Sequence, residues 1–276
     1  MKLNRIILVL AALTSLIIAG CGGKDKDRIR SEREMYDRAY SSLNSGAYET
    51  AIERYTALSA AYPFGTYTTQ GELEICYAHY KLKNSDEAVP CVDEFLSLHP
   101  THPHIDYAYY LKGLAHLPLR APRLGERFFK TQEQFSDHDA ESAREAYEAF
   151  NVVIERFPFS EYAESSRTIL VNLINAFARH DLRIARFYLY RNAYVGAINR
   201  VKQVLLRYET SPHTEEALAI LIYAYEQLEL PELAADNRRV LSYNFPGSKY
   251  LGNEHIVLDQ EILERSTKPL LLGVFR

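Results

Sequence analysis

The feature that most constrains the fold of this chain is a short phrase that recurs along it. Proline follows an aromatic ring at Tyr62-Pro63, Phe157-Pro158 and Phe245-Pro246, and a tyrosine comes four residues after each of these prolines. An alanine stands twelve positions before each proline, and Pro100 has the same spacing. The pairs are Ala51 with Pro63, Ala88 with Pro100, Ala146 with Pro158, and Ala234 with Pro246. A phrase that returns in this way indicates a repeated structural unit.

Each copy of the phrase predicts a helix with one apolar face. Large apolar residues mostly stand four and seven positions after the alanine, as Tyr55 and Leu58 do in the first copy. This is helical spacing, and the helix ends at the proline because proline cannot continue it. A second helix is expected upstream in the first two copies. There Ala39 and Cys76 lie twelve positions before the alanine, and Gly46 breaks the chain within the first copy.

A small residue, an alanine and a proline at intervals of twelve form the pattern of tetratricopeptide (TPR) repeats, which are pairs of antiparallel helices. Small residues at the crossing points let the two helices approach closely. Such pairs bury their apolar faces by stacking on one another. We therefore expect an all-α, TPR-like helical-hairpin solenoid of about five repeats, wound into a right-handed superhelix.

The N-terminus has the pattern of a secretory signal. Lys2 and Arg5 accompany an apolar run at 6–18 that is shorter than the ~20 residues needed to span a bilayer. The following Ile-Ala-Gly-Cys resembles the lipobox of bacterial lipoproteins, in which the chain is cut before the cysteine and its thiol is lipidated. The resemblance makes Cys21 the expected lipidation site; the alternative is a plain signal peptide with an incidental cysteine. Gly22 takes the place of the aspartate that usually retains lipoproteins at the inner membrane, so the resemblance implies a lipid-anchored protein on the periplasmic face of the outer membrane.

The spacing also divides the chain into segments. In the third repeat Gly113 is the small residue at the helix crossing. The alanine expected twelve positions later does not come until Ala146, so an insertion is expected between them. It is either a tolerated surface loop or a functional element. The apolar tail near Pro269 caps the stack, docks a partner or is disordered. The expected segments are a signal peptide at 1–20, a lipidated tether at 21–32, N-terminal repeats at 33–116, the insertion at 117–138, C-terminal repeats at 139–250, and a helix with a tail at 251–276.

Two cysteines remain in the expected mature chain, Cys76 and Cys91. An oxidising compartment permits a disulfide between them. Their sequence positions do not show that the two sulfur atoms are close enough, and both residues occupy helical patterns. Two small buried thiols are therefore favoured over a bridge.

The sequence contains no motif that indicates catalysis. The formal net charge is −4, so no basic excess favours nucleic acid as a partner. No Gly-rich phosphate loop, nucleophile elbow or metal-binding His-Glu helix occurs in the sequence. His99, His102 and His104 lie close together, but their spacing matches no zinc site. We expect no enzyme activity, no cofactor and no metal.

Tyrosine is abundant, with 21 copies and no tryptophan in the chain. Rigid aromatic faces with one polar tip suit recognition of an extended or hairpin peptide at low entropic cost. In TPR proteins the first helix of each pair lines a concave groove, and about half of the tyrosines at those positions are expected to be exposed, with the others packed between helices. The candidate groove residues are Tyr36, Tyr40, Tyr77, Tyr80, Tyr107 and Tyr110.

Longer phrases resemble the BamD family, also called the ComL or competence-lipoprotein family. They are "YPFGTYTTQGELEICYAHYK", "LHPTHPHIDYAYYLKGL", "DAESAREAYEAFNVVIERFPFSEYA" and "RFYLYRNAYVGAINRVKQVLLRYETSPHTEEAL". The likeness covers about residues 21–250. The chain departs from the family in "RYETSP", where proline usually follows the tyrosine directly, in the two cysteines of the second repeat, and in its longer tail.

The resemblance implies a non-enzymatic adaptor lipoprotein of the β-barrel assembly machinery. Its N-terminal repeats would bind unfolded outer-membrane protein precursors. Its C-terminal repeats would bind the periplasmic domains of the barrel-forming subunit and other lipoproteins. Arg191 and Arg200 are candidates for a charged contact with that subunit, although Arg200 could equally be a solvated helix charge. The alternative function is a TPR lipoprotein that coordinates cell-wall processes or competence and DNA uptake.

Overall fold

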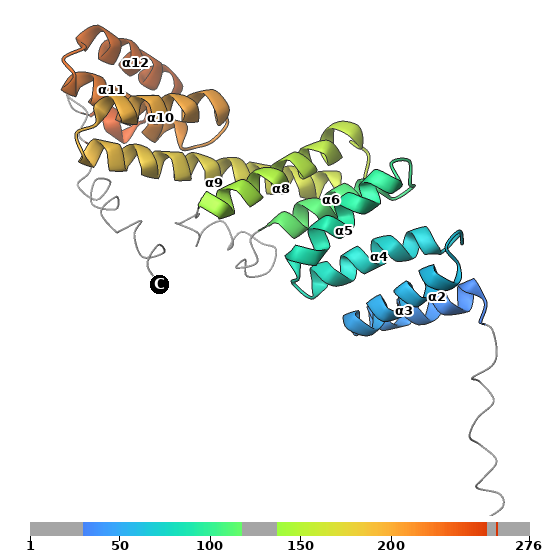
Figure 1. Cartoon of the computed structure of the whole chain (residues 1–276). Helices are drawn as coiled ribbons and strands as arrows, with labels where there is room; N and C mark the ends of the chain where they lie inside the picture. The colour runs from blue at the N-terminus through green and yellow to red at the C-terminus, as the bar shows by residue number, and fades with distance from the viewer. Residues whose placement is uncertain (1–29, 118–136, 253–257, 259–276) are drawn as a thin grey trace, which may run out of the picture. The chain divides into compact units, whose positions relative to one another are not determined.

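The described part of this computed structural model comprises residues 30–117, 137–252 and 258. Within it the chain forms ten α-helices, one short 3-10 helix and no strand, so the all-α prediction is confirmed. The chain divides into two compact units, Met1–Ala78 and His79–Arg276, and the boundary falls inside helix α4. Figure 1 labels the helices of both units. Each unit is described by itself.

The first unit is built from α2 (Glu32–Asn44), α3 (Tyr48–Ala61) and the larger part of α4 (Thr68–Lys81). Helices α2 and α3 lie side by side and form a hairpin (Figure 1). A Ser31–Glu34 capping box begins α2: each side chain accepts a hydrogen bond from the other residue's backbone N–H. Gly46 lies in the turn to α3 with a φ of 80°, a left-handed conformation that favours glycine. The buried core consists of Ala39, Leu43, Ala51, Tyr55, Leu58 and Ala78.

The second unit contains the remaining helices in chain order. They are α5 (Ser85–Leu98), α6 (Ile105–His116), α8 (Asp137–Arg156), α9 (Ala163–Tyr190), α10 (Tyr194–Arg207), α11 (Thr214–Gln227) and α12 (Pro231–Asn244), followed by the 3-10 helix η1 (Lys249–Leu251). Each α-helix of this unit packs against the next one along the chain. The 28-residue α9 contributes to two successive cores. Residues 169–177 belong to the core with α8, and residues 178–189 belong to the core with α10 and α11.

Small residues occupy the helix crossings, as the repeat spacing predicts. The aligned alanines Ala51, Ala88 and Ala146 are completely buried, and Ala234 is nearly so. Gly113 on α6 lies against the ring of Phe150 on α8, and a Cβ atom at this glycine would come within 2.6 Å of the ring. The close approach of α6 and α8 therefore requires glycine at this crossing.

The proline turns share one hydrogen-bond pattern. In the first, the N–H of Tyr62 donates to Leu58, Gly65 donates back to Tyr62, and Thr68 donates to Gly65, in each case to the carbonyl oxygen. The same three steps recur in the turns that begin at His99, Phe157, Tyr208 and Phe245. The fourth turn places Glu209 where the others have proline. The backbone hydrogen bonds form the same turn without proline.

Cys76 and Cys91 are each disulfide-bonded, which corrects the expectation of free buried thiols. Helical periodicity indicates which face of a helix a cysteine occupies, but it says nothing about the separation of two sulfur atoms.

The expected lipidation site Cys21 and most of the 117–138 insertion lie outside the described residues, as does nearly all of the tail after Gly252.

Candidate polypeptide-binding surfaces

Four tyrosines form a cluster in the first unit, called here the N-terminal tyrosine cluster: Tyr36, Tyr40, Tyr55 and Tyr67. The Tyr36 ring lies at its centre. It stacks on Tyr40 with ring centroids 6.0 Å apart, and it packs at 5.7 Å from Tyr55 and 5.1 Å from Tyr67. Aromatic pairs at these distances stabilise one another beyond simple area burial. Two members, Tyr55 on α3 and Tyr67 in the turn before α4, were absent from the sequence-based set.

The members of this cluster differ in access to solvent. Tyr55 is completely buried, Tyr36 is half-buried, and Tyr40 is 44% exposed. Burial, reinforced by the negative charge of Glu74, raises the pKa of Tyr36 to about 12. Its hydroxyl therefore stays protonated at neutral pH and can donate a hydrogen bond. Tyr40 is the exposed member of the cluster, and stacking on Tyr36 holds the Tyr40 ring in place.

A second aromatic group lies in the second unit. Tyr110 on α6 stacks on Tyr162 with centroids 4.9 Å apart, and Tyr107 packs on the same ring at 5.2 Å. The Tyr110 ring also meets the buried Phe150 edge-on at 5.7 Å. Burial raises the pKa of Tyr110, and it raises that of Tyr162 to about 12 together with the neighbouring Glu161. Tyr162 is the tyrosine four residues after Pro158 in the recurring phrase, but that spacing gave no sign that its ring joins two candidate groove tyrosines.

The exposed share of the candidate tyrosines is smaller than expected. Tyr40 is exposed, whereas the other five candidates are half-buried. Tyr77 packs against the core of the first unit. A tyrosine spacing predicts the helix face that carries the rings, but it does not show how far neighbouring rings cover each other.

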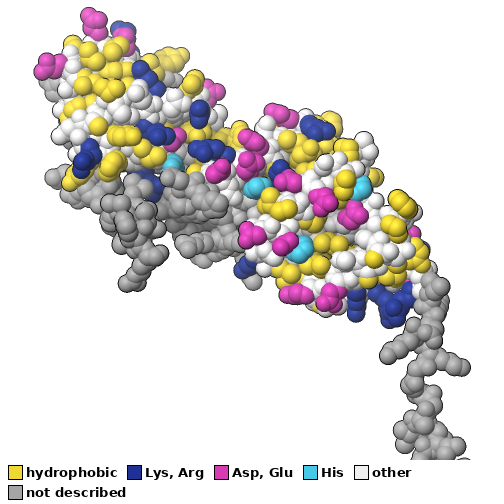
Figure 2. Space-filling model, in the orientation of Figure 1, with side chains coloured by type: hydrophobic (Ala, Val, Ile, Leu, Met, Phe, Trp, Pro, Cys, Tyr) yellow, Lys and Arg dark blue, Asp and Glu magenta, His cyan; other side chains and the backbone are white. Residues whose placement is uncertain are grey.

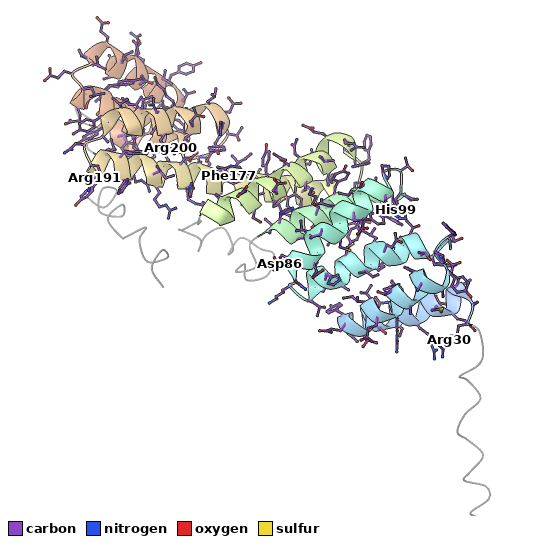
Figure 3. The ribbon with its side chains drawn as sticks, viewed as in Figure 1. Arg30, Asp86, His99, Phe177, Arg191 and Arg200 are labelled. Atoms are coloured by element: carbon purple, nitrogen blue, oxygen red, sulfur yellow. The ribbon has the colours of Figure 1, made fainter. Side chains whose placement is uncertain are left out.

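A shallow pocket of about 240 Å³ lies between α8, α9 and α10. Its lining combines apolar and aromatic side chains with two arginines and one carboxylate: Arg144, Tyr147, Glu148, Ile174, Phe177, Arg207 and Tyr208. Figure 3 labels Phe177 on α9. Burial is the main cause of a raised pKa at Tyr208, with Asp181 adding to it and Arg144 and Arg207 acting in the opposite direction. Sequence reasoning missed this pocket, because its residues come from three helices and share no local motif.

The two candidate arginines occupy different environments. Arg191 is exposed and follows the last residue of α9, where its backbone N–H bonds to carbonyls of that helix. Arg200 lies on α10 and pairs with Asp181 on α9, with 3.2 Å between its Nη1 and the Oδ1 of the aspartate. Figure 3 labels both arginines. The Asp181 side chain is 12% exposed, so Arg200 balances a mostly buried charge while 38% of its own side chain remains accessible.

The histidines near the second proline turn pack around an aromatic ring. His99 and His102 lie 5.1 and 5.2 Å from the Phe95 ring, and the His102 Nδ1 accepts a hydrogen bond from the backbone N–H of His104. Burial lowers the pKa of His102, and the two neighbouring histidines add to the effect. Among the described residues no group of His, Cys, Asp and Glu side chains has a geometry that could hold a metal ion.

Within residues 30–117 and 137–252, no helix combines the length and apolar character needed to cross a membrane.

Comparisons with known proteins give a consistent match. The family model "YfiO: Outer membrane lipoprotein" matches residues 29–241. A Neisseria gonorrhoeae protein named "Outer membrane protein assembly factor BamD" is 36% identical over 254 residues, which cover 90% of this chain and 94% of that protein. A Caulobacter vibrioides protein of the same name is 30% identical over 277 residues, covering 98% of this chain and 86% of that protein. A solved structure of TPR-like repeats from a Podosopora anserina kinesin light chain is 14% identical, with a TM-score of 0.37 over 80% of this chain and all of that one.

Proposed function

Because the chain belongs to the YfiO family of outer membrane lipoproteins, whose relatives include the BamD assembly factors, we propose that it assembles outer membrane proteins as a non-enzymatic adaptor. The observation that carries this proposal is the match over 90% of the chain to a protein named for that role. In this function the protein catalyses no reaction. It binds unfolded β-barrel precursors and the barrel-forming subunit, and so brings them together.

The aromatic surfaces support binding of polypeptide. Tyr40 offers an exposed ring that is held in place by its stacking on Tyr36. A ring fixed in this way loses little conformational entropy on binding. In the second unit Tyr107, Tyr110 and Tyr162 are also held by ring packing, with all three rings half-buried. These rings suit a segment of an unfolded β-barrel precursor, in which aromatic and polar side chains alternate.

The second unit also carries charge that suits a folded protein partner. Arg191 is exposed at the end of α9, and part of the Arg200 side chain is accessible to solvent. Arginine is favoured at protein interfaces, because its planar group forms hydrogen bonds in a fixed geometry. We assign these two arginines to contact with the periplasmic domains of the barrel-forming subunit. Other lipoproteins of the same assembly are expected to bind the C-terminal repeats.

Membrane attachment is assigned to a lipid on Cys21. The sequence Ile18-Ala19-Gly20-Cys21 has the order of a lipobox, and several acyl chains on one residue would give stable anchoring. The Cys21→Ala variant is expected to appear in the soluble periplasmic fraction. Continued sedimentation with the outer membrane would contradict the assignment of the anchor to this residue.

Depletion of the protein tests the proposed function. If it assembles outer membrane proteins, folded β-barrels should decrease in the outer membrane while their unfolded precursors accumulate in the periplasm. Folded and unfolded barrels can be distinguished by their different mobility in gels run without heating. Normal barrel levels accompanied by defective septation or DNA uptake would instead favour a role in the cell wall or in competence.

A further inference from the structure

The turn at residues 62–67 is fixed to the start of the folded chain. The hydroxyl of Tyr62 donates a hydrogen bond to the carbonyl oxygen of Arg30 at 2.7 Å. The backbone N–H of Tyr67 donates to the carboxylate of Glu32. Gly65 lies so close to this carboxylate that a Cβ atom would overlap it. The 62–67 turn and the first described residues, 30–32, therefore form one local structure.

Phe64 is the exposed apolar residue of this turn. Its side chain is 101% exposed, whereas the neighbouring Tyr62 is half-buried. Phe159 occupies the same position in the third proline turn and is also 101% exposed. A fully exposed phenylalanine gives little packing energy to its own fold, so its ring is available for contact with another surface.

The length of the tether limits how far this turn lies from a lipid on Cys21. Arg30 lies nine positions after Cys21. A chain of this length spans at most ~30 Å even when fully extended. A tether this short keeps the 62–67 turn at high effective concentration near the surface that holds the acyl chains.

Charge near the same point favours a lipid surface. The tether carries Lys24, Lys26 and Arg28 against Asp25 and Asp27, and both Arg30 and Arg33 are exposed. Figure 2 shows Lys and Arg side chains gathered at the end of the first unit where the N-terminal segment begins, and Figure 3 labels Arg30 there. Residues 24–30 thus carry a small basic excess next to the anchor, which is attracted to anionic lipid, although Glu32 and Glu34 reduce this excess at the turn itself.

We propose that the 62–67 turn is a second membrane contact, in which Phe64 inserts its ring between the phospholipid headgroups next to the anchor. This inference rests on the proposed lipidation of Cys21. The anchor holds the protein to the membrane, and the Phe64 contact orients the first unit on the lipid surface. Because the N-terminal tyrosine cluster belongs to the first unit, the Phe64 contact also orients this cluster on the lipid surface.

Tryptophan fluorescence tests this contact directly, because the chain contains no tryptophan. The lipidated full-length protein carrying Phe64→Trp is purified and reconstituted on vesicles of phosphatidylethanolamine and phosphatidylglycerol. The matched control is Phe159→Trp, a substitution at an equally exposed turn of the second unit. We expect the emission of the Phe64→Trp protein to shift to shorter wavelength and to be quenched by brominated lipids. The Phe159→Trp protein should show neither change.

Flotation of both variants with the vesicles reports the lipid anchor separately. If both float and neither tryptophan is quenched, the anchor stands and the Phe64 contact is wrong. Equal quenching of the two variants would also overturn the proposal, since it would show lipid contact without any dependence on the 62–67 turn. If neither variant floats, the anchor itself fails and the inference that rests on it fails with it.

Discussion

Arg200 on α10 and Asp181 on α9 form an ion pair, with 3.2 Å between the guanidinium nitrogen and the carboxylate oxygen. A residue assigned to a partner contact thus also stabilises its own repeat. Replacing Arg200 with alanine leaves a mostly buried carboxylate without this partner, and we expect a loss of about 1–2 kcal/mol in the free energy of unfolding. Urea denaturation followed by circular dichroism measures this change.

Arg239 supplies the matched control for the Arg200 prediction. It pairs with Asp236 three residues away on α12, and both side chains are largely exposed. The Arg239→Ala variant should change the free energy of unfolding by less than about 0.5 kcal/mol. If both substitutions changed the free energy of unfolding equally, burial of Asp181 would not add to the cost of losing its arginine partner.

Gly113 on α6 sets how closely α6 and α8 approach each other. The added Cβ atom of Gly113→Ala would come within 2.6 Å of the Phe150 ring, and this ring is completely buried and packs on Tyr110. Alanine favours a helix by about 1 kcal/mol over glycine, but overpacking in a core costs about 1–3 kcal/mol. We expect a net loss of up to about 2 kcal/mol in the free energy of unfolding, and a lower melting temperature. The control is Gly247→Ala, because nothing lies within 4 Å of a Cβ atom there and its stability should not change.

Tyr40 and Tyr36 separate recognition from stability in the N-terminal tyrosine cluster. Tyr40 is 44% exposed, so Tyr40→Ala should weaken binding of a peptide from a β-barrel precursor while the melting temperature stays nearly the same. Tyr36 packs against three rings, so Tyr36→Ala should lower both binding and the melting temperature. Fluorescence anisotropy with a labelled peptide and thermal unfolding measure the two effects. Unchanged affinity of the Tyr40→Ala variant would remove this surface from the proposed function.

Stability should fall in mildly acidic solution, and His213 is one cause. Burial lowers its pKa below the ordinary value of 6.5, and Arg179 and Arg186 act in the same direction while Glu216 opposes them. The unfolded chain therefore binds this proton more readily than the folded chain. The free energy of unfolding decreases as the pH falls below about 6.5 and is insensitive to this group at higher pH. Melting temperatures across this range should depend less on pH in His213→Gln than in the unchanged protein.

The helices and their crossings could be predicted from the sequence, because each depends on residues close together along the chain. The spacing from Ala51 to Pro63 defines one helix, its buried face and its end, and the structure has α3 at Tyr48–Ala61. Gly113 could be placed at a crossing because it takes the position of a small residue in the repeat. The turn at Tyr208 shows the limit of this reasoning, since the backbone hydrogen bonds form there with Glu209 in place of proline.

The candidate site could be predicted only in part, because it depends on contacts between distant residues. The spacing places Tyr36 and Tyr110 on helix faces, but their contacts with Tyr67 and Tyr162 come from turns that lie far from them in the sequence. The ion pair of Arg200 depends on the register of two helices, which spacing does not report. The pocket lined by Phe177 and Tyr208 combines residues from three helices and has no signature in the sequence.

Affinity purification tests the adaptor function most directly. The tagged, lipidated protein is isolated from outer membranes solubilised in a mild detergent, and the proteins that remain bound are identified by mass spectrometry. The account predicts co-purification of a large β-barrel protein with periplasmic domains, and weaker recovery of that protein when Arg191 and Arg200 are both replaced by glutamate. Absence of any such barrel protein from the purified material, with the tagged chain intact and membrane-bound, would contradict it.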